Sequence, residues 1–436
     1  MSFPDGAPAP GLLTDRYELT MLRAALADGT ASRRTVFEVF TRRLPGGRRY
    51  GVVAGTARIV AAVSRFRFPD GELRSLQRAG VLDERTAEYL AGWRFEGDLD
   101  GYPEGELYFP GSPVLTVSGT FADCVVLETL VLSVLNHDCA VAAAAARMVI
   151  AAGSRPVIEM GSRRTHEQAA VAAARAAYLV GFAATSNLAA GAGYGIPTAG
   201  TAAHAFTLLH DSEADAFRAQ LAALGVDTTL LVDTYDITAG IRAAVEVAGT
   251  DLGGVRIDSG DLAVHAHAAR RQLDALGARS TQVVLSGDLD EHALAALAAA
   301  PVDVYGVGTA VVTGSGAPTA GLVYKLVEVD GRPVAKRGSD KASVGGRKLA
   351  LRRHRATGTA TAEVLLIGAD PPGGQPANVL GERHLQVPFL RGGSPVPAAS
   401  LDQSRSHHRE VMITLPWEGL KLSPGEPAIP TEFGPA

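Results

Sequence analysis

The segments TLLVDTYD (229–236), GVRIDSGD (254–261) and QVVLSGDLD (282–290) decide the fold class of this chain of 436 residues. Each is a short apolar run that ends in a polar cluster, and an alanine-rich stretch with helical spacing follows. Four further runs share the pattern: PVIEMGSRR (156–164), GFAATSN (181–187), TAGTAAHAF (198–206) and DVYGVGT (303–309). Continuous apolar strands that alternate with helices are typical of a parallel sheet covered on both faces. The repetition favours an α/β fold with a (β/α) barrel-like domain over an open sheet.

The chain before and after these repeats has a different pattern. TVFEVFTRRL (35–44) and GELYFPGSPVLTVSG (105–119) alternate like half-exposed strands, whereas residues 57–65 and 82–94 have helical spacing. We therefore expect a mixed α/β domain over residues 1–119 and the barrel-like catalytic domain over 120–350. Strand character returns near residue 320, with Asp330-Gly331 as a hairpin signal. Residues 351–436 are expected to pack as strands and loops, either completing the N-terminal domain or covering the barrel.

The charge and composition of the chain indicate which kinds of molecule it binds. The net charge is −5 and 47% of the residues are hydrophobic, so no clustered basic surface is expected for nucleic acid or an anionic membrane. The first residues, MSFPDGAPAPG, lack the basic and apolar regions of a signal peptide. Polar residues at 136–138 and Arg147 interrupt the apolar run 124–153, which favours a core helix over a membrane span. Cys124 and Cys139 are interpreted as buried apolar residues. These features predict a cytoplasmic protein that acts on small molecules.

The active site of a parallel barrel lies at the carboxyl ends of its strands. That rule gathers one set of candidate residues: Arg163, Ser186, His204, Asp233, Asp236, Arg256, Asp258, Asp261, Asp288 and the turn 306–309. Among them, Gly306 and Gly308 let the backbone approach an oxyanion closely, although glycines in such turns are also common for steric reasons.

The segment RIDSGD (256–261) is more specific. Its carboxylates can hold sugar hydroxyls while its guanidinium holds an anion. The alternative is a buried arginine–aspartate pair that closes the barrel. Asp233 and Asp236 are the expected Mg²⁺ ligands, since carboxylates and water suit that ion; Asp233 could equally cap a helix.

Three further local patterns carry predictions. His204 stands among small residues that leave room for a substrate, which favours a reactive role over a satisfied core histidine. Asp288, with Glu291 three positions on, has the form of a capping box. Only five of the 41 basic residues are lysines, and four, Lys325, Lys336, Lys341 and Lys348, fall within 24 positions. The cluster indicates a need for a compact ammonium charge, or else a solvated pair of strands with lysines placed by chance.

Eight motifs in order resemble the nicotinate phosphoribosyltransferase family. They are TDRYELTM (14–21), FEVFTRRLPGGRRYGVVAG (37–55), EMGSRR (159–164), ATSN (184–187), GTAAHAF (200–206), VDTYD (232–236), RIDSGDL (256–262) and VYGVGT (304–309). The resemblance covers about residues 12 to 350 and implies the type II phosphoribosyltransferase architecture. It also implies transfer of phosphoribosyl from phosphoribosyl pyrophosphate to nicotinate in NAD biosynthesis. Mg²⁺ and ATP hydrolysis accompany the step, and the family is also classed with ligases that form a C–N bond.

The resemblance also implies residue roles. His204 aligns with a histidine that ATP phosphorylates transiently, and Tyr17 with a ring-stacking residue that crosses the interface of a homodimer. The remaining implied contacts are Arg163 for the substrate and diphosphate; Arg256, Asp258 and Asp261 for ribose and anion; Gly287, Asp288, Gly306, Gly308 and Thr309 for the 5′-phosphate; and Lys325, Lys341 or Lys348 for other phosphates. Met160 stands where many members have phenylalanine opposite the tyrosine, and a thioether still packs on an aromatic ring.

Ser186 bears on whether the substrate is nicotinate, a carboxylic acid, or nicotinamide, the corresponding amide. Related nicotinamide-using enzymes have an aspartate at this position, and a carboxylate about 4 Å from a carboxylate substrate would cost on the order of 4 kcal/mol. Serine removes that repulsion and can donate a hydrogen bond. The rival hypotheses are an enzyme of the same architecture that uses nicotinamide or quinolinate, a silent relative that only binds pyridine nucleotides, and an unrelated barrel aldolase or isomerase.

Overall fold

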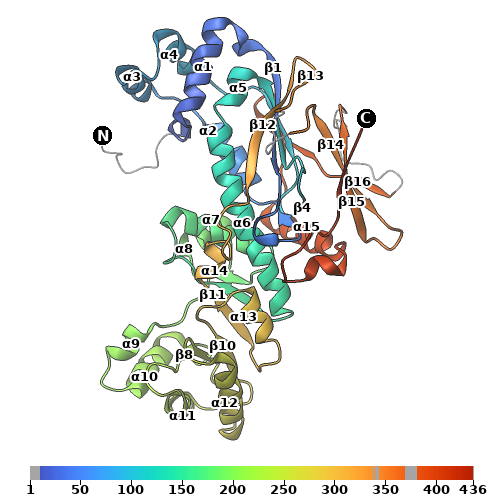
Figure 1. The fold of residues 1–436 in the computed structure, drawn as a ribbon. Coiled ribbons are helices and arrows are strands. Elements are labelled where there is room, and N and C mark those ends of the chain that lie inside the picture. Colours follow the sequence, from blue (N-terminus) through green and yellow to red (C-terminus); the bar gives the residue numbers. More distant parts are fainter. Residues whose placement is uncertain (1–9, 337, 339–342, 369–380, 436) are drawn as a thin grey trace. The chain divides into compact units, whose positions relative to one another are not determined.

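The computed structural model describes residues 10–336, 338, 343–368 and 381–435 (Figure 1). The chain divides into two compact units: unit 1 is Met1–Ala140 with Thr319–Ala436, and unit 2 is Val141–Pro318. These bounds differ from the expected ones, because residues 120–140 and 319–350 belong to unit 1. The reason lies in strand pairing, since β12 (Leu322–Val329) pairs antiparallel with β1 (Arg34–Thr41) over nearly its whole length.

Unit 1 is built on a seven-stranded sheet in the order β13-β12-β1-β5-β3-β17-β18. The bounds of its other strands are β3 (Asp98–Gly101), β5 (Leu115–Thr120), β13 (Arg332–Pro333), β17 (Val387–Arg391) and β18 (Ser394–Pro395). All its pairings are antiparallel. The C-terminal strands therefore complete the N-terminal sheet, which decides between the two alternatives for the tail. The hairpin signal is confirmed, because Asp330 and Gly331 both have positive φ between β12 and β13.

The helices of unit 1 share one apolar core with this sheet. They are α1 (Arg16–Asp28), α2 (Thr56–Arg65), α3 (Asp70–Arg78), α4 (Glu84–Ala91), α5 (Phe121–Val125) and the first half of α6 (Glu128–Ala152). Phe37 of β1 stacks on Tyr324 of β12, with ring centroids 4.8 Å apart, and both belong to this core. The helices expected near 57–65 and 82–94 are confirmed as α2 and α4. Helix α6 is long and apolar enough to span a membrane, but 67% of its most apolar window is buried, as expected of a core helix.

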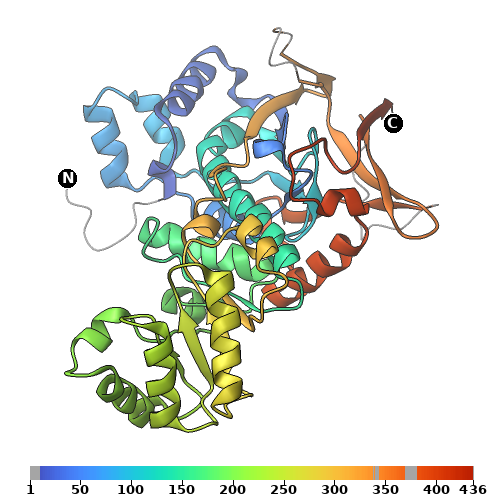
Figure 2. The same ribbon diagram turned by 60° about the horizontal axis from the view of Figure 1, so that its bottom comes forward.

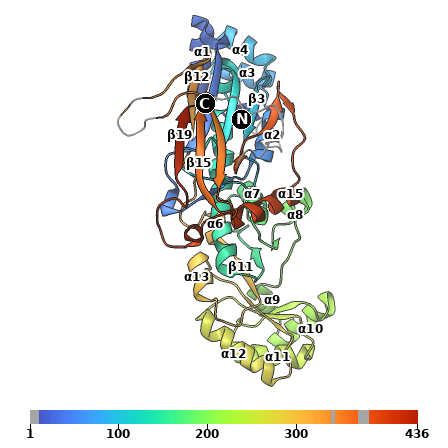
Figure 3. The same ribbon diagram turned by 90° about the vertical axis from the view of Figure 1, so that its right-hand side faces the viewer.

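The C-terminal part of unit 1 adds smaller elements. A four-stranded sheet has the order β16-β14-β15-β19, and β2 (Gly51–Val52) pairs with β4 (Leu107–Tyr108). The strands of the four-stranded sheet are β14 (Lys348–His354), β15 (Ala360–Ile367), β16 (Glu382–His384) and β19 (Thr431–Pro435), and helix α15 covers Leu401–Ile413. Strand β19 lies parallel to β15, as Figure 3 shows.

Unit 2 is a parallel sheet of six strands in the order β7-β6-β11-β10-β9-β8. The strands are β6 (Val157–Glu159), β7 (Ala184–Thr185), β8 (Thr229–Leu231), β9 (Gly254–Ile257), β10 (Gln282–Leu285) and β11 (Val304–Val307). Its helices, which Figure 2 shows from below, are α7 (Glu167–Leu179), α8 (Leu188–Tyr194), α9 (His204–Leu208), α10 (Glu213–Leu224), α11 (Ile237–Ala248), α12 (Leu262–Ala275), α13 (Glu291–Ala296) and α14 (Thr309–Val312). The α/β prediction is confirmed, with β7 and β8 at the two ends of a half-barrel.

One expected strand is wrong. The run TAGTAAHAF (198–206) forms only an isolated bridge from Thr198 to Thr185, and helix α9 begins at His204. The run follows β7 only around Thr198, where the Ala199 amide donates to Thr185 O at 2.9 Å, and the chain then turns into the helix. His204 consequently begins a short helix and does not end a strand.

Candidate functional site

Parallel strands bring the polar residues that follow them to one edge of the unit 2 sheet. Backbone bonds from Ser186 N to Glu159 O (2.8 Å) and from Ser286 N to Ile257 O (3.0 Å) continue the pairing beyond the strand ends. We call this edge, from Glu159 at the end of β6 to Thr309 after β11, the strand-end site. Most of the predicted site residues of unit 2 lie along it.

His204 and Asp233 form the most distinctive pair in the strand-end site. The Nε2 atom of His204 lies 3.9 Å from Asp233 Oδ1, and its Nδ1 lies 3.1 Å from Thr234 Oγ1. The His204 side chain is 41% exposed, whereas that of Asp233 is 1% exposed. An accessible imidazole therefore stands in front of a buried carboxylate.

Asp233 also organises the loop after β9. Its Oδ2 accepts hydrogen bonds of 2.8 Å from the Asp258 amide and from the Ser259 hydroxyl. Its Oδ1 is buried without a hydrogen-bond partner among the residues that the structure describes. The carboxylate thus joins the His204 helix to the RIDSGD segment.

Asp258 and Gly287 connect the ends of β9 and β10. The Ser286 hydroxyl donates to Asp258 Oδ1 at 2.5 Å. Gly287 has a φ of +129°, and a Cβ there would come within 2.9 Å of the Asp258 carbonyl oxygen. Because only glycine fits this position without strain, the two strand ends approach closely and hold the Asp258 carboxylate in place.

Two arginines give the site its positive charge. Arg256 donates to the Thr201 hydroxyl, and its Nε atom is buried with no hydrogen-bond partner in the described part of the chain. Burial lowers the pKa of Arg256, Asp258 and Asp233 raise it, and the charge of Arg163 lowers it further. Arg163 itself is exposed. The two guanidiniums are close enough to repel each other, an arrangement that an anion between them would stabilise.

Small residues around Met160 allow β6 and β11 to approach. A Cβ at Gly306 would lie 2.7 Å from Met160 Sδ, and a Cβ at Gly308 would lie 3.2 Å from the Met160 carbonyl oxygen. The Met160 amide donates to Val307 O at 2.7 Å. Gly306 is therefore needed for the packing of Met160, and Gly308 with Thr309 begins α14.

Glu159 and Thr185 were missed by the sequence reasoning. The Glu159 carboxylate is buried and accepts from the Gly161 amide and the Thr185 hydroxyl, while burial raises its pKa. A glutamate inside the apolar run VIE was the signal for such a buried polar contact. Through Ser186 N, Glu159 fixes the segment that carries the half-buried Ser186.

Several predicted ligands are helix caps. Asp236 caps α11 by accepting from the Ala239 amide at 2.7 Å, and Asp261 caps α12 by accepting from the Val264 amide at 3.1 Å. The capping role considered for Asp233 thus belongs to Asp236. The predicted capping box at Asp288 is wrong, because Asp290 caps α13 and Asp288 is exposed. The N-cap is the residue at which the backbone enters the helix, and sequence spacing placed the N-cap of α13 two residues too early.

These caps bear on the expected magnesium site. Within the described residues, no group of three His, Cys, Asp or Glu side chains gathers to hold a metal ion. Asp233 faces His204, and one oxygen of Asp236 is committed to its helix. The two carboxylates do not fit a metal cage made by the protein alone.

Two predicted site residues of unit 1, Tyr17 and Lys325, contact the same glutamate, Glu128. Tyr17, on the first turn of α1, is 46% exposed, and its hydroxyl hydrogen-bonds to Glu128. Burial and the neighbouring carboxylates raise the pKa of the Tyr17 phenol far above its usual range. Lys325 Nζ lies 3.8 Å from Glu128 Oε1 and donates to Tyr324 O at 2.7 Å. Tyr17 and Lys325 thus share one carboxylate partner.

Lys348 has a contact that the sequence did not predict. Its ammonium group is buried and donates to Glu38 Oε2 at 2.6 Å and to the carbonyl oxygens of Val344 and Gly346 at 2.9 Å. These three bonds use all three protons, so Lys348 offers none to a phosphate in this structure. Lys341 lies outside the described residues.

The half-barrel sheet, with arginines, a histidine and glycine turns at its strand ends, defines a type II phosphoribosyltransferase. The family models for the nicotinate phosphoribosyltransferase (NAPRTase) N-terminal domain and the NAPRTase family match residues 12–136 and 156–363. The chain therefore belongs to the nicotinate phosphoribosyltransferase family.

Known proteins agree with this assignment over almost the whole chain. A nicotinate phosphoribosyltransferase of Mycobacterium tuberculosis is 62% identical over 99% of this chain and 97% of its own length. That of Bacillus subtilis is 38% identical over 78% of this chain and 72% of its own. The crystal structure of the human nicotinic acid phosphoribosyltransferase covers 97% of both chains with a TM-score of 0.83 and 28% identity.

Proposed function

We propose that the chain transfers phosphoribosyl from phosphoribosyl pyrophosphate to nicotinate in the cytoplasm, for NAD biosynthesis, and couples the transfer to ATP hydrolysis through His204. The observation that carries the proposal is the exposed His204 imidazole in front of the buried Asp233 carboxylate. A histidine nitrogen that attacks the terminal phosphorus of ATP forms a P–N bond as ADP leaves. The ring then carries positive charge, which Asp233 stabilises at 3.9 Å.

The transfer itself requires positioning more than covalent help. The pyridine nitrogen attacks C1 of the ribose while pyrophosphate leaves, so positive charge develops on the sugar and negative charge on the leaving group. Arg256 and Arg163, whose charges lie close enough to repel, are proposed to stabilise that negative charge. Asp258, which accepts a hydrogen bond from Ser286, is proposed to bind the ribose hydroxyls. Gly287, Asp288 and the turn 306–309 are proposed to receive the 5′-phosphate.

Nicotinate is favoured over nicotinamide by Ser186. The hydroxyl of this half-buried serine can donate to the carboxylate of nicotinate. Among the described residues, the carboxylate bonded to the segment around Ser186 is that of Glu159, which already accepts hydrogen bonds from Gly161 and Thr185. Mg²⁺ is proposed to enter with the phosphates of ATP and phosphoribosyl pyrophosphate, whose oxygens suit it as ligands. The exposed Tyr17 is proposed to reach the site of a second copy in a homodimer.

The test measures ATP hydrolysis by the purified protein with phosphoribosyl pyrophosphate and Mg²⁺, in the presence of nicotinate, nicotinamide or neither. We expect nicotinate, but not nicotinamide, to raise the rate of ATP hydrolysis. The variant His204→Ala should lose this increase. Unchanged ATP hydrolysis with nicotinate, together with formation of nicotinate mononucleotide, would contradict the coupling. No product with either base, combined with calorimetric binding of the substrates, would instead favour a silent binder.

A further inference from the structure

Arg256 of the strand-end site is anchored by a neutral group. It is the third residue of β9 (Gly254–Ile257), and its Nη1 atom donates to the hydroxyl of Thr201, 55 positions earlier in the chain. Among the described residues, this is the one hydrogen bond of the Arg256 side chain, and its Nε atom is buried without a partner. A guanidinium has five N–H groups. Most of the hydrogen-bonding capacity of Arg256 therefore stays unused within the described chain.

Two carboxylates lie near the Arg256 guanidinium without pairing with it. Burial lowers the pKa of Arg256, and the charges of Asp258 and Asp233 raise it, but neither carboxylate forms an ion pair with Arg256 in the described residues. Both are bonded elsewhere, because Asp233 Oδ2 accepts from the Asp258 amide at 2.8 Å and Asp258 Oδ1 accepts from the Ser286 hydroxyl at 2.5 Å. The Thr201 hydroxyl carries no charge. It consequently fixes the direction of the guanidinium and leaves its positive charge available.

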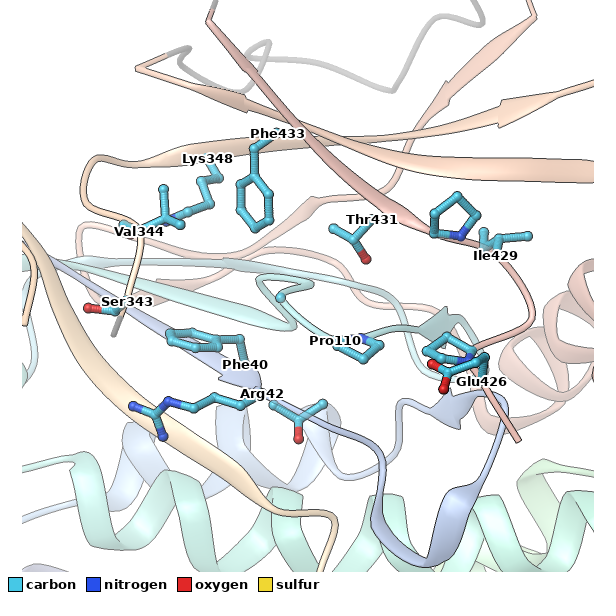
Figure 4. A pocket seen from close by; sticks show the side chains of 14 residues that line it. Phe40, Arg42, Pro110, Ser343, Val344, Lys348, Glu426, Ile429, Thr431 and Phe433 are labelled. Carbon is cyan, nitrogen blue, oxygen red and sulfur yellow. The ribbon is translucent and has the colours of Figure 1, made fainter. Parts of the chain in front are cut away.

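Lys348 in unit 1 shows the opposite arrangement. It lines a cavity of about 610 Å³, and Figure 4 shows its side chain at the cavity wall. Its ammonium group, however, donates to the buried carboxylate of Glu38 at 2.6 Å and to two carbonyl oxygens at 2.9 Å. A cation paired with a buried carboxylate belongs to the packing of the fold, whereas a cation held by a neutral hydroxyl can still bind an anion. The contrast indicates that the bond between Thr201 and Arg256 prepares a binding site.

The backbone holds Thr201 in place on both sides. Two residues before it, the Ala199 amide donates to Thr185 O at 2.9 Å. Two residues after it, Ala203 is the N-cap of α9, and its carbonyl oxygen accepts from the Phe206 amide at 2.9 Å. The segment is thus tied both to β7 and to α9. Its hydroxyl is already ordered before a ligand binds, which lowers the entropy cost of binding.

We propose that Thr201 is a positioning residue for phosphoribosyl pyrophosphate: its hydroxyl holds the Arg256 guanidinium toward the diphosphate of the substrate. The inference rests on the proposed role of Arg256 in binding that group and adds the residue that orients it. Without the hydroxyl, the guanidinium turns toward Asp233 or Asp258, or regains the rotamer freedom that it loses when the substrate binds. In either case the affinity for phosphoribosyl pyrophosphate falls, while nicotinate, which has no diphosphate, binds as before.

Calorimetric titration of the full-length protein with phosphoribosyl pyrophosphate and Mg²⁺, in the absence of nicotinate, measures the Kd without turnover. Thr201→Val keeps the branched shape and removes the hydroxyl, so the Kd should rise about tenfold or more, as expected when a hydrogen bond to a charged group is lost. Thr201→Ser keeps the acceptor and should bind within about twofold of the wild type. The matched control is Thr198→Val, which should not change the Kd, because Thr198 is exposed and its hydroxyl makes no hydrogen bond in the described part of the chain.

Arg256→Met completes a double-mutant cycle. This change alone should raise the Kd at least as much as Thr201→Val does. Thr201→Val should then add nothing to it, because the hydroxyl has no guanidinium left to hold. Steady-state kinetics of Thr201→Val should show a higher KM for phosphoribosyl pyrophosphate and an unchanged KM for nicotinate. A purely structural role would instead lower the free energy of unfolding in urea and change both KM values, and Thr201→Ala provides a second variant without the hydroxyl.

Three results would overturn the proposal. They are a wild-type Kd in Thr201→Val, an equally increased Kd in Thr201→Val and Thr201→Ser, and an effect of Thr201→Val that persists in full in the Arg256→Met background. A wild-type Kd in Arg256→Met would contradict the proposed role of Arg256 itself, and the inference would fall with it. The single variants thus separate a failure of this inference from a failure of the proposed function.

Discussion

Unit 1 and the strand-end site of unit 2 handle charge in opposite ways. In unit 1, Arg352 is fully buried, with Glu363 Oε2 at 2.7 Å and Glu106 Oε1 at 3.5 Å, and both carboxylates are equally buried. In the strand-end site, the buried Asp233 faces an exposed histidine at 3.9 Å, and Arg163 is exposed. Buried charges that are matched to one another specify a packing arrangement, whereas charges left open to solvent can bind a ligand. The two regions therefore differ in the partner of the buried charge: in unit 1 both members of a pair are buried, and in the strand-end site one member is open to solvent.

The largest expected effect tests the structural side of this comparison. Arg352→Ala leaves Glu363 buried without its cation, while Glu106 keeps Arg383 at 2.7 Å, and breaking a buried pair typically costs about 3–5 kcal/mol. Urea denaturation would measure the free energy of unfolding. The matched control is Arg353→Ala, whose exposed ion pairs with Glu382 and Glu432 should contribute about 1 kcal/mol or less. Equal losses in the two variants would contradict the comparison.

The second prediction concerns Ser186 in the strand-end site, and its expected effect is of similar size. Ser186→Asp places a carboxylate near the carboxylate of nicotinate, which at about 4 Å should cost on the order of 4 kcal/mol, roughly a thousandfold in kcat/KM for nicotinate. Steady-state kinetics with nicotinate and nicotinamide would measure the loss for the acid and any gain for the amide. Ser186→Ala is the control for lost hydrogen bonding alone. Unchanged nicotinate kinetics in the aspartate variant would remove Ser186 from the site.

The pH dependence of unit 1 should be somewhat smaller. Burial lowers the pKa of His408 to about 4, and its Nδ1 lies 2.9 Å from Gly105 O. In the unfolded chain the histidine pKa is near 6.5, so on acidification the unfolded chain binds a proton before the folded chain does. The contribution of neutral His408 to the free energy of unfolding is therefore full above about pH 6.5 and is lost as the pH falls toward 4. The loss should amount to about 3 kcal/mol in the free energy of unfolding. Denaturation curves between pH 7 and 4 would measure it, and His408→Gln should flatten the dependence if the histidine causes it.

The smallest effect separates a helix cap from a ligand. Asp261→Ala should lower stability by about 1 kcal/mol, because α12 loses its N-cap. Asp261→Ser keeps a capping oxygen and should restore stability while still lacking a carboxylate. If Asp261→Ser also keeps the KM for phosphoribosyl pyrophosphate, the residue is a cap; if KM rises in both variants, the carboxylate binds substrate as the family resemblance implies.

Sequence patterns predicted six of the seven expected strands of unit 2 and failed where local bonding decides. Six apolar runs became parallel strands, but TAGTAAHAF makes one isolated bridge to β7 at Thr198 and then turns into α9. The capping box at Asp288 failed because spacing identifies an acid and not the point where the backbone enters the helix. Lys348 was indistinguishable in sequence from a phosphate ligand until its bond to Glu38, 310 positions away, was visible.

The sequence by itself determined the alternation of strands and helices, the polar residues at the strand ends and the family, because periodicity and motif order are local properties of the chain. Only the tertiary structure decided that the C-terminal strands complete the N-terminal sheet, that Asp233 stands behind His204 and that the Thr201 hydroxyl meets Arg256. Each of these depends on contacts between residues far apart in the chain. Their free energy comes from burial and pairing that no single segment contains.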